Sequence, residues 1–136
     1  MARIRLGYFE RWRNEHPLIL FSGHHFAANK LELIFRDLAK DELKEVDFNS
    51  LCDVETFHGI ELKALRSQEN KGLLRKGEKP SFEWVLSGET WKTFADLLSG
   101  FHEEESGHQY LYVYAEDHTE VMVSINEYPD DWEGWR

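Results

Sequence analysis

The fold of this chain is decided by the stretch PSFEWVLSGETWKTFADLLSG, residues 80–100. Phe82, Trp84 and Leu86 alternate with other residues, and this period of two is typical of a β-strand. The apolar residues that follow recur at the spacing of one helix face: Trp91, Phe94, Ala95, Leu98 and Phe101. Ser87 is a suitable N-cap, since its hydroxyl can accept a hydrogen bond from the first turn. The stretch therefore predicts a strand that leads directly into a helix.

Residues 108–125 predict an antiparallel hairpin. The first run places Tyr110, Tyr112 and Tyr114 on one face, with aliphatic residues at 111 and 113 on the other. The second run is apolar at positions 121, 123 and 125, and the polar residues 116–119 fit the turn between the runs. We expect the tyrosines either to pack under the helices, which is the simpler interpretation, or to form an exposed protein-binding face.

The N-terminal half shows a similar order of elements. The apolar run Leu18–Phe21 predicts a buried strand, and a helix follows to about Lys40. Residues 54–57 and 60–65 predict a second hairpin around Gly59. Residues 3–9 alternate arginine with apolar residues, which favours an edge strand whose arginines face water.

A Ser-Gly pair stands between strand and helix in both halves, at 22–23 and at 87–88. This similarity suggests an internal repeat of residues 18–66 and 82–126, each a β-α-β-β unit, within a single domain of residues 1–136. Each half supplies one helix that can cover a sheet. The predicted fold class is therefore α+β, with two layers and a mostly antiparallel sheet covered by two main helices.

The charge of the chain is negative and unevenly distributed. The 136 residues include 16 basic and 26 acidic ones, for a net charge of −10. Residues 101–136 contain ten acidic residues against Arg136 alone, so this segment carries a charge of −9. That sign disfavours binding to the phosphates of nucleic acids and suits a basic protein partner. Four arginines near the N-terminus, at positions 3, 5, 11 and 13, are expected to pair with this acidic half.

The sequence also bears on location. Cys52 is the only cysteine, so neither an intramolecular disulfide nor a cysteine-rich zinc site is expected. No apolar run approaches the ~20 residues of a membrane-spanning helix, and a charged-then-apolar leader is absent. We therefore expect a cytoplasmic protein that does not associate with membranes.

No motif for catalysis, for a metal ion or for a cofactor stands out. Seven histidines are present, but the HExxH and paired-cysteine spacings are missing, as is the GxSxG motif of a serine nucleophile. Cys52 has no predicted base or helix N-terminus beside it, so a semi-buried structural thiol is the simpler interpretation. We expect no catalytic residue, no metal and no cofactor, and a non-enzymatic role is favoured.

One junction is a candidate for binding an anion. Ser22, Gly23, His24 and His25 lie where the first strand meets its helix, and a helix N-terminus offers unpaired N–H groups. The Gly-rich spacing of nucleotide-binding loops is absent, and ordinary capping by Ser22 explains the same residues. The alternative function is therefore a small-molecule or anion-binding domain, or a weak enzyme, that uses this junction.

The leading hypothesis is a small acidic protein that binds a basic protein partner. Inhibitors and immunity proteins of bacterial toxins have this kind of size and charge, but the likeness is limited to these two properties and is not a match in sequence. Aromatic residues among acids suit such docking, and the expected binding residues are Tyr110, Tyr112, Tyr114, Asp130, Asp131, Trp132 and Trp135. Exposed sheet edges offer a further alternative, in which copies of the chain pair as a homo-oligomer.

Overall fold

The computed structural model describes residues 3–103 and 105–136, which form an α+β fold. Its helices are α1 (His25–Ala39) and α2 (Gly88–Ser99). Its strands are β1 (Ile4–Phe9), β2 (Leu18–Gly23), β3 (Glu45–Asp47), β4 (Val54–Phe57), β5 (Glu61–Ser67), β6 (Gly72–Arg75), β7 (Ser81–Ser87), β8 (Gly107–Tyr110) and β9 (Glu120–Ile125). Short 3-10 helices occur at Trp12–Asn14, Phe48–Ser50, Gly100–Glu103 and Glu133–Trp135.

Both sheets mix parallel and antiparallel pairs. The five-stranded sheet has the order β4-β1-β2-β9-β8, and the four-stranded sheet has the order β3-β5-β7-β6. β1 runs parallel to β4, β2 to β9 and β5 to β7, whereas the other pairs are antiparallel. The α+β class is confirmed, but the sheets are mixed rather than mostly antiparallel. The reason is that the parallel pairs join strands that no hairpin turn connects, so no turn sets their direction.

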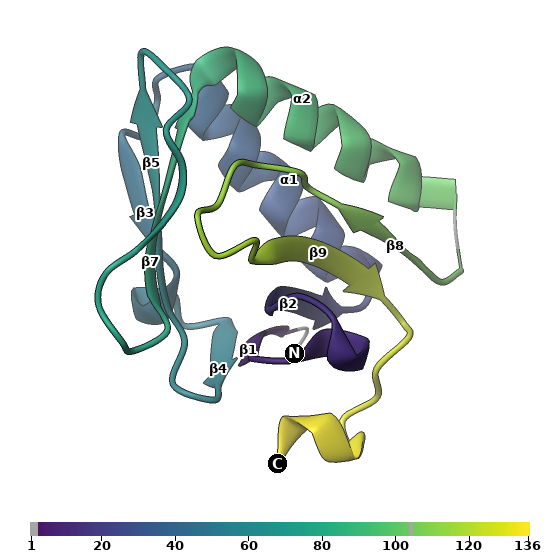
Figure 1. Cartoon of the computed structure of the whole chain (residues 1–136). Helices are drawn as coiled ribbons and strands as arrows, with labels where there is room; N and C mark the ends of the chain where they lie inside the picture. Colours follow the sequence, from purple (N-terminus) through teal and green to yellow (C-terminus); the bar gives the residue numbers. More distant parts are fainter. Residues whose placement is uncertain (1–2, 104) are drawn as a thin grey trace.

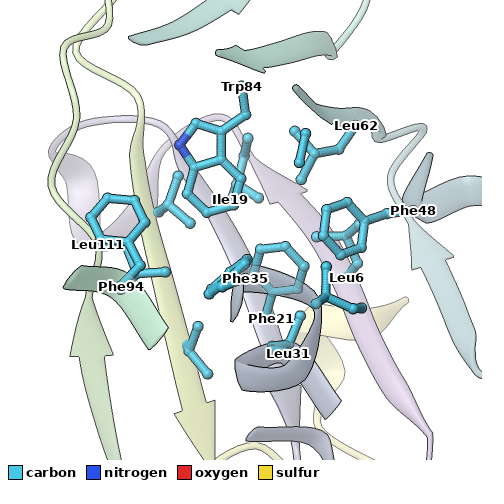
Figure 2. Close-up of a cluster of buried hydrophobic side chains, with 14 of the residues drawn as sticks. Leu6, Ile19, Phe21, Leu31, Phe35, Phe48, Leu62, Trp84, Phe94 and Leu111 are labelled. Carbon is cyan, nitrogen blue, oxygen red and sulfur yellow. The ribbon is translucent and has the colours of Figure 1, made fainter. Parts of the chain in front are cut away.

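The two helices lie against each other over one face of the five-stranded sheet, above β2, β9 and β8 (Figure 1). The strands β3, β5 and β7 stand to one side of them in the same view. One continuous cluster of buried side chains contains residues from both helices and both sheets. Figure 2 shows its centre, where Trp84 of β7 meets Phe35 of α1, with ring centroids 5.7 Å apart. The core therefore joins all layers of the fold.

The stretch 80–100 folds as its spacing predicts. β7 buries all three residues of its predicted inner face, and α2 buries its predicted apolar stripe. The Ser87 hydroxyl accepts a hydrogen bond from the N–H of Thr90 at 3.3 Å, so Ser87 caps α2 as expected. The rings of Trp84 and Trp91 lie 5.0 Å apart, which brings strand and helix into the same core.

β1 is an interior strand, so the prediction of an edge strand at residues 3–9 is wrong. It lies between β4 and β2, and Arg5 is buried. Arg5 forms an ion pair with Asp130, which confirms the expected pairing with the acidic half at this arginine, whereas Arg3 pairs with Glu55 of β4. Alternating arginines indicate an edge only where one face stays open to water, and here the end of the chain covers that face.

The predicted hairpin at residues 54–65 does not form. β4 pairs with β1, whereas β5 pairs with β3 and β7 in the other sheet. A turn does lie between them, and His58 and Gly59 have φ angles of 61° and 75° there. A hairpin turn and a corner between two sheets need the same local residues, because both join short strands through positive φ. By contrast, β8 and β9 form the predicted antiparallel pair, although β8 already ends at Tyr110.

The two halves of the suggested repeat, 18–66 and 82–126, share some features and differ in others. β2 leads into α1 and β7 leads into α2, but β2 and β7 belong to different sheets. His58 and His118, at corresponding turns, have φ angles of 61° and 62°. The duplication stays a prediction.

Candidate functional site

The C-terminal segment, residues 126–136, covers the outer face of the five-stranded sheet, which is the face turned away from the helices. Trp135 is buried there in a second apolar cluster with Leu18 and Leu20 of β2 and Met122 of β9. Successive strand residues point to opposite faces, so these side chains point away from the main core. Figure 1 shows the segment beneath β1 and β2. Both faces of this sheet are therefore covered in its central part.

Most of the predicted binding residues in this segment contact other parts of the same chain. Trp135 is buried against Phe57 of β4, with ring centroids 4.8 Å apart. Trp132 is half-buried and lies 5.2 Å from Trp135 between ring centroids. Asp130 pairs with Arg5, while Asp131 is exposed. The structure therefore brings Trp132, Trp135 and Asp130 together as contacts that hold the segment in place.

The tyrosine stripe faces solvent, so the interpretation that it packs under the helices is wrong. Tyr112 is 72% exposed and Tyr114 is 70% exposed. Tyr110 is half-buried, and its ring stacks on that of Tyr112 with centroids 5.7 Å apart and planes 13° apart. Burial raises the pKa of Tyr110, and the charge of Glu120 adds to the effect. We call these three residues the tyrosine surface.

The backbone on either side holds the tyrosine surface in this orientation. The N–H of Leu111 donates to the carbonyl of Val121 at 2.9 Å, and the N–H of Leu73 in β6 donates to the carbonyl of Tyr114 at 2.8 Å. Leu111 and Ala115 are both buried. Because side chains alternate along an extended segment, residues 112 and 114 then point outward. The segment between β8 and β9 thus joins the two sheets and presents tyrosines to solvent.

Carboxylates surround the tyrosine surface. One hollow of about 310 Å³ is lined by Tyr112, Tyr114 and Glu120, and another of about 410 Å³ is lined by Tyr114, Glu116, Asp117 and Arg75. Neither Glu116 nor Glu120 has a basic partner among the residues that the structure describes. Each hollow therefore has one glutamate without a basic partner beside an exposed ring, while Arg75 pairs with Asp117.

Asp117 differs from these two glutamates because it has both hydrogen-bond donors and a basic partner. Burial alone would raise the pKa of Asp117, but hydrogen bonds from the Thr119 hydroxyl at 2.7 Å and from its N–H at 3.1 Å outweigh that effect. Arg75 adds an ion pair at 3.5 Å. The pKa of Asp117 is therefore held below its ordinary value, and the carboxylate helps to fix the turn beside the tyrosine surface.

The residues of the predicted anion site do not converge. Ser22 is buried on the outer face of the sheet, opposite to α1, and its hydroxyl has no hydrogen-bond partner among the described residues. The N-cap of α1 is His24, which makes no side-chain cap and instead has Nδ1 2.6 Å from Oδ1 of Asn126. Gly23 is pressed against Ala27, and His25 is half-buried. Ser22 therefore neither caps the helix nor points toward the two histidines.

A pocket that the sequence analysis missed lies beside the end of β1 and has a volume of about 870 Å³. Its aromatic walls are Tyr8, Phe9, Trp12, Tyr128 and Trp132, and its arginines are Arg11, Arg13, Arg75 and Arg136. We call it the aromatic–arginine pocket. Its only signal in the sequence is the run Arg11-Trp12-Arg13, because the other walls come from distant segments.

Arg75 is fixed at the edge of this pocket. Its guanidinium donates to the Tyr8 hydroxyl at 3.0 Å and to the carbonyl oxygen of Glu78 at 2.6 Å, and it lies 5.3 Å from the centroid of the Tyr8 ring. On another wall, burial raises the pKa of Tyr128, an effect that Arg13 partly opposes. The pocket therefore combines positioned positive charge with aromatic rings.

Other chemistry has little support in the described residues. No three side chains of His, Cys, Asp or Glu gather there in a way that would hold a metal ion. Cys52 is a free and exposed thiol, so the expectation of a semi-buried one is wrong. Within the same residues, no helix is both long and apolar enough to cross a membrane.

Comparison with known proteins finds no family model, no curated protein and no solved structure that matches this chain.

Proposed function

We propose that this protein acts by binding a basic partner protein at the tyrosine surface, without catalysing a reaction. The observation that carries the proposal is the exposure of Tyr112 and Tyr114, at 72% and 70%, on a backbone anchored at both ends. Tyrosine is among the residues that contribute most to binding energy in protein interfaces. An anchored segment also loses little conformational freedom on binding, which favours affinity.

The surroundings of the tyrosine surface favour a basic partner. Residues 101–136 carry a charge of −9. Glu116 and Glu120 each border one of the two hollows that Tyr114 lines, and both lack basic partners in the described part of the chain. A lysine or arginine of the partner could lie over a tyrosine ring while it pairs with one of these carboxylates. The remaining negative charge would speed the encounter with such a partner.

The alternative of an anion site at Ser22–His25 has less support. The Ser22 hydroxyl is buried on the face of the sheet opposite to α1, whereas His24 contacts Asn126. A site that needs these side chains to converge would require a rearrangement of β2. Binding at the tyrosine surface needs no such change.

The proposal is tested with the variant Tyr112→Ser/Tyr114→Ser and a matched control, Phe26→Ser/Leu33→Ser, which removes two exposed apolar residues from α1. Immobilised wild type is used to isolate partners from a cell extract, and each purified partner is then titrated by calorimetry. We expect a partner with excess positive charge, bound about tenfold or more weakly by the tyrosine variant and equally by the control. Raising the salt concentration from about 50 to about 300 mM should weaken this binding.

Three outcomes would contradict the proposal. The first is that wild type and the tyrosine variant bind every purified partner equally. The second is that binding does not depend on salt. The third is that light scattering shows a dimer of wild type that the tyrosine variant abolishes, since the surface would then pair copies of the chain.

A further inference from the structure

The aromatic–arginine pocket is separate from the tyrosine surface and has the composition of a ligand site. Its volume of about 870 Å³ lies in the range of pockets that hold small molecules. Four segments that are distant in the sequence form it: the end of β1 with residues 10–13, the turn at His58, the end of β6 with the loop that follows it, and the C-terminal segment. The pocket therefore exists only in the folded chain.

The rings of this pocket pack together at close range. The centroids of Trp12 and Tyr128 are 5.6 Å apart, and those of Tyr128 and Trp132 are 4.5 Å apart. Phe9 lies 5.3 Å from Trp12 and 5.6 Å from Trp132. Trp12, Tyr128 and Trp132 are only half-buried, so a planar ligand can reach their remaining surface. Such a surface suits stacking with a flat ring.

The pocket is rich in arginine, although the whole chain is acidic. Four arginines and three glutamates line it in a protein of charge −10, and one of the four, Arg75, also pairs with Asp117. Arg75 is fixed by hydrogen bonds, and the Arg13 guanidinium lies 5.8 Å from the centroid of the Trp12 ring. The side chains of Arg11 and Arg136 are exposed and have no partner among the described residues. Two arginines thus remain available for a ligand.

Two residues of the pocket also have an unusual backbone. Arg13 and His58 are not glycines, yet their φ angles are 53° and 61°. Nε2 of His58 lies 2.6 Å from the carbonyl oxygen of Gly134, so this nitrogen carries the proton that it donates. Both residues help to set the shape of the pocket.

We infer that the aromatic–arginine pocket binds a small anion that carries a planar aromatic ring. The ring would stack on Trp12 and its aromatic neighbours, and the anionic group would accept hydrogen bonds from Arg11 and Arg136. Arginine suits this role because its planar guanidinium pairs with carboxylates and phosphates and stacks on rings. An aromatic carboxylate and a nucleoside monophosphate share this chemistry.

The test is an NMR titration that follows the indole N–H signals of the five tryptophans. Four probes separate ring from charge: 2-naphthoate and AMP have both, 2-naphthalenemethanol has only the ring, and inorganic phosphate has only the charge. We expect 2-naphthoate or AMP to bind with a dissociation constant of about 1 mM or tighter. The other two probes should bind at least about tenfold more weakly. The signals of Trp12 and Trp132 should move, while those of Trp84 and Trp91 in the main core stay in place.

Variants locate the site. Arg11→Gln/Arg136→Gln should weaken the better anion about tenfold and leave 2-naphthalenemethanol unchanged, and these exposed positions should not disturb folding. Lys40→Gln/Lys63→Gln is the matched control, since it removes the same charge from exposed positions outside the pocket and should bind as wild type does.

Tighter binding of AMP would identify a nucleotide, and tighter binding of 2-naphthoate would identify a carboxylate. Equal binding of the neutral and anionic rings, unchanged binding by the arginine variant, or no binding of either anion would overturn the inference.

Discussion

Arg5 of β1 and Asp130 of the C-terminal segment form an ion pair that ties the first strand of the chain to its last segment. The two partners are buried to very different degrees, because the side chain of Arg5 is 11% exposed and that of Asp130 is 81% exposed. Water therefore screens the charge of the Asp130 carboxylate, whereas the aliphatic part of Arg5 packs against the covered face of the sheet.

This difference predicts unequal costs for removing the two partners. We expect Arg5→Ala to lower the free energy of unfolding by about 2 kcal/mol, because packing is lost together with the ion pair. Asp130→Ala should cost less than about 1 kcal/mol, as exposed carboxylates usually do. Urea denaturation followed by far-UV circular dichroism measures both values. Equal costs, or a larger cost at Asp130, would contradict the prediction that the packing of Arg5 contributes more to stability than the exposed carboxylate does.

The C-terminal segment should depend on Trp135 more than on Trp132. Trp135 is buried in the outer cluster and Trp132 is half-buried. We expect Trp135→Ala to lower the free energy of unfolding by about 3 kcal/mol, as large-to-small changes in cores do, and Trp132→Ala to cost clearly less. Hydrogen exchange of β2 and β9 amides should speed up in the Trp135 variant, because the outer face of the sheet loses its cover. Unchanged exchange would show that the segment does not protect this face.

Gly72 should be essential for the position of Tyr114. Its φ angle is 97°, and a Cβ atom added there would lie 2.2 Å from the carbonyl oxygen of Tyr114. Gly77 is the matched control, because its φ angle is 86° but no atom lies within 4 Å of an added Cβ. We expect Gly77→Ala to cost about 1 kcal/mol from backbone strain alone, and Gly72→Ala to cost about 3 kcal/mol. Thermal and urea denaturation compare them, and similar costs would refute the close contact.

Replacing the buried serines of β2 and β9 by alanine should change the stability of the protein in different ways. Ser22 and Ser124 are neighbours in register, and both are buried. The Ser124 hydroxyl donates to Glu127, whereas the Ser22 hydroxyl has no partner in the described part of the chain. Ser22→Ala should therefore be neutral or stabilising, while Ser124→Ala should cost about 1 kcal/mol. A clear loss of stability for Ser22→Ala in urea denaturation would show that the hydroxyl has a partner.

The protein should lose stability at low pH as the Asp117 carboxylate becomes protonated. Burial would raise the pKa of Asp117, but the hydrogen bonds from Thr119 and the contact with Arg75 hold it below its ordinary value. A carboxyl group with a lowered pKa stabilises the folded state fully above the unfolded pKa of about 3.9, and this contribution is lost as the pH falls through the folded pKa.

The variant Asp117→Asn tests this dependence, with Asp131→Asn at an exposed position as the control. We expect Asp117→Asn to be less stable than wild type near pH 7, and the difference to shrink as the pH falls from about 5 to about 2. Urea denaturation at a series of pH values measures it. A difference that stays constant or grows toward low pH would mean that Asp117 is not held in its charged form.

Several parts of the fold could be predicted from residue spacing. The spacing of Trp84 and Trp91 relative to their neighbours was sufficient for β7 and for α2, and Ser87 marked the boundary between them. The tyrosines were correctly placed on one face of their segment. Whether that face was buried could not be predicted, because alternation shows that two faces differ and not which of them meets the helices.

Residue spacing could not predict the aromatic–arginine pocket or the covered outer face of the five-stranded sheet. The sequence predicts only that Arg11 and Arg13 pair with the acidic half of the chain, since nothing near them shows that Arg75 and Tyr128 lie close by. Similarly, the residues around His58 and Gly59 predict a hairpin, because a corner between two sheets uses the same local residues.

By itself, the sequence determined the α+β class, the two helices, most strands and the negative charge of the C-terminal half. These properties depend on side chains a few residues apart, whose spacing decides which face of each element is apolar. The tertiary structure alone decided the mixed pairing of the strands, the burial of Arg5 and Trp135, the exposure of Tyr112 and Tyr114, and the aromatic–arginine pocket. Each of these depends on which distant segments come into contact, and that is settled by packing the whole chain around its core.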